Sequence, residues 1–135
     1  NDEKRSLRAL VVWYETGETI TAHDERTRSL PPKYDALRVC LTFSRREDLW
    51  DRIDRRVDLM MEAGLEEEVR SLLSSGVPPT ATAMQAIGYK EFAAALRGEE
   101  PIAQAVAEVK LRSRQYAKRQ LTWFRRTPDI RWLTW

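Results

Sequence analysis

Residues 101–124 have the sequence PIAQAVAEVKLRSRQYAKRQLTWF, which is the longest helical pattern in the chain. Apolar side chains recur in it at intervals of three and four residues, and proline is tolerated in the first turn of a helix. The segment therefore predicts one long helix from Pro101 to about Phe124. Its packed face is expected to carry Ile102, Val106, Val109, Tyr116 and Trp123.

Basic residues crowd the second half of this segment. From Lys110 to Arg126 there is no acid, and the basic residues are Lys110, Arg112, Arg114, Lys118, Arg119, Arg125 and Arg126. Such side chains can contact phosphates, while the aromatic rings among them can stack on unpaired bases. A solvated amphipathic helix has the same composition. From the residues alone, both an RNA contact and a plain surface helix stay open.

Shorter elements are predicted on both sides of the long helix. Before it we expect a helix from Asp2 to about Tyr14, a polar loop from Thr19 to Lys33, a strand at about 36–43 inside a sheet, and a helix up to Glu62. Ser44 and Glu47 match a capping box at the start of that last helix. Helices at 65–73 and 89–96, a loop at 80–86 and a strand at 130–134 complete the pattern. The predicted fold class is α/β, predominantly helical, in a single region 1–135.

Composition limits the kind of protein further. The 135 residues carry a net charge of +2, one cysteine and one histidine, so no usual zinc-ligand set is available. Cys40 lies in an apolar run and is expected to be a buried structural thiol. No apolar run approaches the roughly 18 residues of a membrane span, and the start lacks both a signal-peptide pattern and an initiating Met. We expect a cytoplasmic chain that is truncated at its front.

Three arginines fall on one side of the helix predicted after Ser44, namely Arg45, Arg52 and Arg56. They fit a clamp for a phosphate or diphosphate, and they equally fit surface pairs with nearby acids. No Gly-x-x-x-x-Gly-Lys-Ser/Thr phosphate loop occurs in the sequence, so nucleotide binding of that kind is not expected here. No catalytic residue and no metal ligand is predicted.

Four segments together resemble the tRNA dimethylallyltransferase family, also called tRNA isopentenyltransferases. They are Asn1-Asp2-x-x-Arg5-x-x-Arg8-Ala9-Leu10, Arg46-x-x-Leu49-x-x-Arg52-Ile53-x-x-Arg56, Ala83-Met-Gln-Ala-Ile-Gly-Tyr-Lys-Glu91 and Arg114-Gln-Tyr-Ala-Lys-Arg-Gln-Leu-Thr-Trp-Phe-Arg125. They follow one another in the family's order along almost the whole chain. Lys4 stands where the family usually has Gln.

The resemblance implies an activity and a division of labour. Members transfer a dimethylallyl group from dimethylallyl diphosphate to N6 of adenosine 37 in tRNA, in a P-loop NTPase-like fold with a helical insertion, and with Mg²⁺ as cofactor. The phosphate loop, the catalytic Asp and most of the insertion would precede Asn1. This chain is therefore expected to be the C-terminal part of the domain and inactive alone, with an exposed sheet edge that favours self-association.

The resemblance also assigns residues to partners. Contacts to the tRNA anticodon stem-loop are expected from Lys4, Arg5, Arg8, Gln85, Ala86, Ile87, Gly88, Tyr89, Lys90, Lys118, Arg119, Gln120, Leu121, Thr122, Trp123, Phe124 and Arg125. Contacts to the diphosphate are expected from Arg46, Arg52 and Arg56. We expect Arg8, Lys90 and Lys118 to share one RNA-facing surface. A standalone RNA-binding module and a helical protein-interaction domain are the alternatives.

Overall fold

The computed structural model describes residues 2–31 and 33–135. The chain forms two compact units, Asn1–Ala36 and Leu37–Trp135. The prediction of one region over 1–135 stays a prediction.

The first unit is a pair of helices, α1 (Asp2–Thr16) and α2 (Ile20–Ser29). The predicted first helix is confirmed, and Gly17 ends it with a φ of +70°, a conformation that glycine adopts without strain. The loop predicted at 19–33 is wrong, because most of it is α2. Extended Thr19 caps this helix by accepting a hydrogen bond from the Ala22 N–H at 3.2 Å. Ile20 and Ala22 are the only apolar residues of α2, so it left no apolar periodicity to detect.

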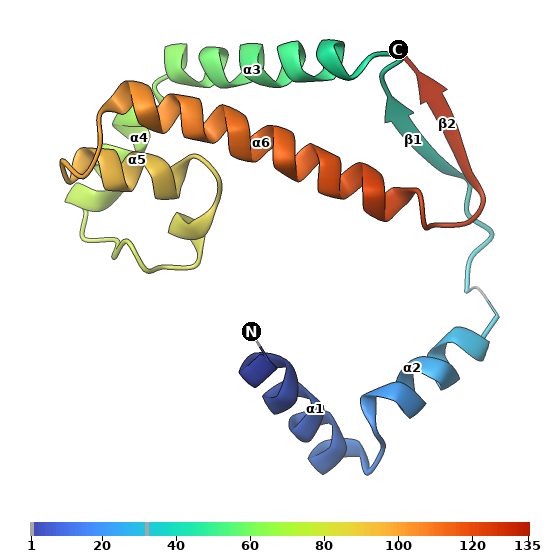
Figure 1. Cartoon of the computed structure of the whole chain (residues 1–135). Helices are drawn as coiled ribbons and strands as arrows, with labels where there is room; N and C mark the ends of the chain where they lie inside the picture. The colour runs from blue at the N-terminus through green and yellow to red at the C-terminus, as the bar shows by residue number, and fades with distance from the viewer. Residues whose placement is uncertain (1, 32) are drawn as a thin grey trace. The chain divides into compact units, whose positions relative to one another are not determined.

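The second unit contains a parallel two-stranded sheet of β1 (Arg38–Thr42) and β2 (Ile130–Thr134), in register from Arg38 opposite Ile130 to Thr42 opposite Thr134 (Figure 1). Both predicted strands are confirmed. Within the described residues each strand has a single neighbour, so β1 is not the interior strand that its apolar content predicted. Leu41 is 70% exposed as a result. Cys40 is only partly buried for the same reason, which corrects the expectation of a buried thiol.

Helices connect the two strands. They are α3 (Arg46–Glu62), α4 (Leu65–Ser74), the 3₁₀ turn η1 (Ala83–Gln85), α5 (Tyr89–Leu96) and α6 (Ile102–Phe124). The bounds of α3, α4, α5 and α6 agree with the sequence patterns to within two residues, and η1 lies within the segment predicted as a loop at 80–86. The predicted capping box at Ser44 is wrong. The Ser44 hydroxyl donates instead to the Trp135 carbonyl at 3.4 Å, and Arg45 precedes the helix without a side-chain cap.

The hydrophobic core lies where α3, α4, α5 and the first half of α6 meet, at the end of this unit away from the sheet (Figure 1). Its largest fully buried side chains are Phe92, Met84, Val69 and Val109. Their burial removes the apolar surface that drives these helices together. Helix α6 runs from this core towards the sheet and connects the two ends of the unit.

The packed face predicted for the long helix is correct only in its first half. Val109 is buried, and Ile102 and Val106 pack against the core. Tyr116 and Trp123 are instead 49% and 64% exposed. The reason is length. A helix of 23 residues spans about 34 Å, whereas α5, with 8 residues, covers only its beginning.

Candidate nucleic-acid interface

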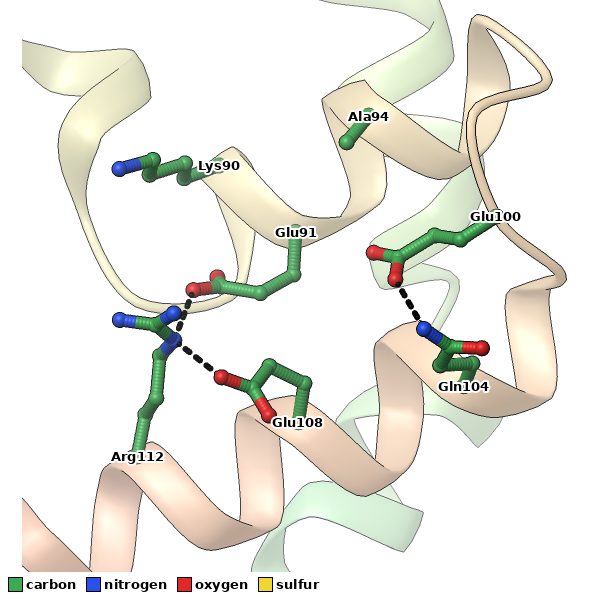
Figure 2. Close-up of a pocket in the computed structure, with 7 residues that line it drawn as sticks. All are labelled: Lys90, Glu91, Ala94, Glu100, Gln104, Glu108 and Arg112. Atoms are coloured by element: carbon green, nitrogen blue, oxygen red, sulfur yellow. Dashed lines mark hydrogen bonds and ion pairs between the residues drawn. The ribbon is translucent and has the colours of Figure 1, made fainter.

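The basic residues of α6 from Lys110 to Arg114 are neutralised by acids. Lys110 Nζ lies 2.5 Å from Asp58 Oδ1, and Arg114 forms two hydrogen bonds with the Asp54 carboxylate, one of them from Nε at 2.8 Å. The Asp54 bond is also the main cause of an Arg114 pKa above its ordinary range. Arg112 Nε lies 2.7 Å from Glu108 and 3.2 Å from Glu91 (Figure 2). These three cations stabilise contacts between helices or within α6, and their charge is largely cancelled.

The basic residues from Lys118 to Arg126 lack such acidic partners among the described residues. Lys118, Arg119, Arg125 and Arg126 are exposed, and none has an acid within ion-pair distance in the part of the chain that the structure describes. The exposed Trp123 lies among them, and the Arg119 guanidinium lies 5.7 Å from the Tyr116 ring centre. Uncancelled cations beside exposed aromatic rings can hold phosphates and unstacked bases.

Of the other α6 residues expected to contact RNA, some pack within the fold and some are exposed to solvent. Leu121 and Phe124 are partly buried, and Phe124 packs edge-on against Trp123 at 5.1 Å between ring centres. Thr122 is exposed, but its hydroxyl donates to the Lys118 carbonyl at 2.9 Å and so belongs to the helix itself. Gln120 is exposed.

The turn from Gln85 to Lys90 is held mostly by internal contacts. The Gln85 amide donates to the Pro79 carbonyl at 2.9 Å, and Ile87 packs against the core. Gly88 is buried with a φ of +104°, and a Cβ there would lie 3.7 Å from Leu65 Cδ2. Ala86 and Lys90 are exposed. Of this predicted set, Lys90 is the charged side chain that remains available to a partner.

Tyr89 in the same turn donates its hydroxyl to Glu68 Oε1 at 2.6 Å. This hydrogen bond is the largest cause of a raised Tyr89 pKa, with loss of hydration and the Glu68 charge adding to it. The contact joins α4 to the start of α5. Its geometry gives Tyr89 a structural role, which membership of a motif does not reveal.

Glu91 is a residue that the site predictions missed. It is 6% exposed, accepts a hydrogen bond from the Gly88 N–H at 2.8 Å and pairs with Arg112 (Figure 2). A signal was present in the sequence, because Glu three residues after a helix-starting position commonly satisfies a free N–H. Glu91 therefore ties the turn to the middle of α6.

Lys90 and Lys118, two of the cations expected to share one surface, line different hollows within the second unit. Lys90 lines hollows beside α5 and the first half of α6, whereas Lys118 lines hollows beside the second half of α6. Lys4, Arg5 and Arg8 lie on α1 in the first unit, where they are exposed and have no acidic partner among the described residues. Shared contact by all three segments stays a prediction.

The three arginines expected at the diphosphate lie on two sides of α3. Arg46 is 5.3 Å from the Trp50 ring centre, while Arg52 is 5.5 Å from that of Trp135 and lines a separate hollow with Arg56. Six residues of helix separate Arg46 from Arg52, a rotation of about 240°. Of the surface pairs considered, Arg45 with Glu47 is present, at a long 3.9 Å. In the described chain Arg52 and Arg56 have no acidic partner.

Two further features concern residues 2–31 and 33–135 only. No three His, Cys, Asp or Glu side chains gather there as metal ligands would. Over the same residues, no helix combines the length and the apolar character that crossing a bilayer requires. The Mg²⁺ expected from the resemblance stays a prediction.

The fold and this surface define a mostly helical α/β protein with a parallel strand pair and a region of free cations suited to a polyanion. Comparison with known proteins gives the family. The family model described as IPP transferase matches residues 1–127, and the chain belongs to that family.

Curated relatives and solved structures agree. The chain is 43% identical over 133 residues to a tRNA dimethylallyltransferase of Acetivibrio thermocellus and 46% identical over 133 residues to one of Desulforudis audaxviator; each match covers 98% of this chain and 42% of the relative. Solved tRNA isopentenylpyrophosphate transferases of Bacillus halodurans and Staphylococcus epidermidis superpose with a TM-score of 0.73, at 40% and 39% identity. These cover 82% and 99% of this chain, and 36% and 43% of those proteins. The chain thus spans about two-fifths of the length of its relatives.

Proposed function

We propose that this chain is the C-terminal, tRNA-holding part of a transferase that moves a dimethylallyl group from dimethylallyl diphosphate to N6 of adenosine 37 in tRNA. In this proposal the complete domain is P-loop NTPase-like, works in the cytoplasm and binds the anticodon stem-loop. Family membership and the names of the relatives support the reaction. The distribution of free cations supports the role of this part.

The observation that carries the proposal is the contrast between the cations of α6 up to Arg114 and those from Lys118 onward. Lys110, Arg112 and Arg114 have acidic partners, whereas Lys118 and Arg119 have none among the described residues. Surface cations with a purely structural role are stabilised by nearby acids, as Arg112 and Arg114 are. Exposed cations without such acids keep their charge for an external anion.

The reaction explains why the enzyme must grip its RNA. The amine of a stacked adenine cannot reach an allylic carbon, so the base must leave the stack, and unstacking costs a few kcal/mol. Phosphate contacts position the strand, and aromatic faces replace the lost stacking partners. The exposed Trp123, among Lys118, Arg119 and Arg125, supplies both kinds of contact.

The diphosphate and its cation take a smaller part in the proposal. Arg52 and Arg56 are exposed and without acidic partners in the described chain, so they suit the negative charge that grows on the leaving diphosphate. The described residues offer no cluster of acids for Mg²⁺. In this proposal Mg²⁺ is therefore held by the diphosphate oxygens and not by these residues.

The test is RNA binding as a function of salt. The variant Lys118→Gln/Arg119→Gln removes two free cations and keeps polar side chains of similar length. We expect about tenfold weaker binding of a labelled anticodon stem-loop in fluorescence anisotropy, because two charge-assisted phosphate contacts are lost. The slope of log affinity against log salt should fall by about 0.7–0.9 for each lost contact.

A control variant with the same change of charge separates contact from net charge. Arg70 lies on α4 paired with Glu66, and Arg131 is exposed on β2, so Arg70→Gln/Arg131→Gln leaves every residue of α6 unchanged. We expect its affinity to stay within about twofold of the unaltered chain, as for most surface substitutions. If both variants lose RNA affinity equally, the loss follows from net charge alone, which contradicts the proposal.

A further inference from the structure

A groove of about 480 Å³ opens between α3 and the second half of α6, where strand β1 ends. One wall comes from the chain after β1 and the first turn of α3, including Arg45, Arg46 and Trp50. The other comes from α6 and the residue that follows it, including Arg114, Lys118 and Arg125. We call it the β1–α3–α6 groove. It lies wholly within the second unit.

The groove carries uncancelled positive charge. Its lining contains five basic residues and, among the residues described, no acid. Arg114 is committed to Asp54, and Arg45 has only Glu47 at 3.9 Å, an exposed pair that contributes little. Arg46, Lys118 and Arg125 have no acidic partner in the described chain. Like charges gathered in one concave surface repel one another, and an anion bound there relieves the repulsion.

Trp50 holds one of these charges in place. The Arg46 guanidinium carbon lies 5.3 Å from the Trp50 ring centre, and that of Arg114 lies 5.7 Å from the same ring. Cations over an indole ring are attracted by its negative face. Because Arg114 is in turn bonded to Asp54, the ring and the two guanidiniums form a connected set. Arg46 is therefore partly oriented before a ligand arrives, which lowers the entropy cost of binding.

The position in the fold is also one where ligands bind. β1 and β2 are parallel, and Thr42 to Ser44 at the carboxyl end of β1 contribute to the groove. Open α/β sheets bind their ligands in the crevice outside the carboxyl ends of such strands. The charge and the topology thus indicate the same place independently.

We propose that the β1–α3–α6 groove binds a phosphoryl group, held by Arg45 and Arg46 from α3's start and by Lys118 and Arg125 from α6. Guanidiniums suit this ligand because two N–H groups can donate to two phosphate oxygens at once. The proposal separates Arg46 from Arg52 and Arg56, which line a different hollow. It also gives roles to Arg45 and Trp50, which no motif includes.

The phosphoryl group has two sources, a phosphate of the RNA backbone or the diphosphate of the allyl donor. Only this choice of sources rests on the proposed function, since the groove itself is defined by its charge and place. The experiment uses Arg45→Gln/Arg46→Gln in the 135-residue chain. Binding of inorganic pyrophosphate is measured by calorimetry, and binding of the labelled anticodon stem-loop by anisotropy, with Arg70→Gln/Arg131→Gln as the charge-matched control.

We expect about tenfold weaker binding of one ligand in the groove variant and a change within about twofold in the control. Loss in the RNA arm assigns the groove to the backbone, and loss in the pyrophosphate arm assigns it to the donor. The single change Arg46→Lys keeps the positive charge but removes the bidentate guanidinium. We therefore expect a smaller loss of affinity for the same ligand. Circular dichroism checks that each variant is folded.

Two results would overturn the inference: unchanged binding of both ligands in Arg45→Gln/Arg46→Gln, or no binding of either ligand by the unaltered chain. The proposed function is tested separately. If Lys118→Gln/Arg119→Gln weakens RNA binding and the groove variant leaves both ligands unaffected, the groove is not a phosphoryl site while the tRNA-holding role stands.

Discussion

At the scale of single residues, several members of the family motif around Gly88 make contacts within the fold. Gln85 bonds to Pro79, Tyr89 bonds to Glu68, and Gly88 occupies a backbone conformation that strains other residues. Lys90 is the exposed cation of the turn. A residue of a family motif can therefore serve to shape a turn as well as to touch a ligand.

Tyr89 offers a test of this structural role. Its hydroxyl donates to Glu68 and its pKa is raised, so the protonated form stabilises the fold below the ordinary tyrosine pKa of about 10. Tyr89→Phe should lower the free energy of unfolding at pH 7 by about 0.5–1.5 kcal/mol. The difference from the unaltered chain should shrink as the pH rises above about 10, because the folded state then resists an ionisation that the unfolded state undergoes.

Urea unfolding at pH 7 and at higher pH measures this difference. Tyr116→Phe is the matched control, since the Tyr116 hydroxyl is exposed and has no hydrogen-bond partner within the described residues. Its effect should stay within about 0.5 kcal/mol. Equal stability of Tyr89→Phe and the unaltered chain at pH 7 would refute the role given to Tyr89.

At the scale of elements, one helix performs two tasks. The part of α6 up to Arg114 packs on α3 and α5 and uses its cations in ion pairs, whereas the cations that follow have no acidic partner among the described residues. The periodicity of the segment is continuous through both halves. Whether a position is packed depends on where the shorter helices end, and that is a property of the neighbours rather than of α6.

The contact between α3 and α6 can be tested through Asp54. This partly buried carboxylate receives two hydrogen bonds from Arg114, so Asp54→Asn should lower the free energy of unfolding by about 1–2 kcal/mol. RNA affinity should not fall, because the freed Arg114 remains a cation in the groove. Chemical unfolding and stem-loop anisotropy measure the two effects.

Asp48→Asn is the matched control, since Asp48 is exposed on the same helix and has no ion pair in the part of the chain described. Its effect on stability should be within about 0.5 kcal/mol. If both variants are equally stable, the bond between the helices adds nothing to the fold. If Asp54→Asn instead weakens RNA binding while leaving stability unchanged, Asp54 belongs to the RNA site and not to the helix contact.

At the scale of the whole molecule, the chain spans about two-fifths of the length of its relatives and contains no phosphate loop. We expect the 135 residues alone to leave tRNA unmodified when supplied with dimethylallyl diphosphate and Mg²⁺. Mass spectrometry of digested tRNA detects the dimethylallyl adenosine. Modification by the 135 residues alone would show that the catalytic groups lie within them.

The two strands expose apolar side chains, which bears on whether whole molecules associate. Leu41 and Leu133 lie opposite each other in the sheet and are both exposed, and unpaired strand edges favour association. Self-association of the 135 residues stays a prediction, and sedimentation at increasing concentration would measure it.

Much of this protein follows from local sequence. The bounds of α1, α3, α4, α5 and α6 and the two strands follow from apolar periodicity and from glycine or proline at their ends, because these signals act within a few residues. Helix α2 escaped prediction because only Ile20 and Ala22 in it are apolar, which leaves no periodic pattern. The basic character of the second half of α6 is likewise plain from the residues alone.

Tertiary structure decided which of these residues are free to act. The acids that neutralise Lys110, Arg112 and Arg114 include Asp58, Glu91 and Asp54, which are distant in sequence and approach only when α3 and α5 pack on α6. The same packing places Arg45 and Arg46 on one groove with Lys118 and turns Arg52 away. Charge is a property of a residue, but whether it is cancelled depends on distances that only the folded chain sets.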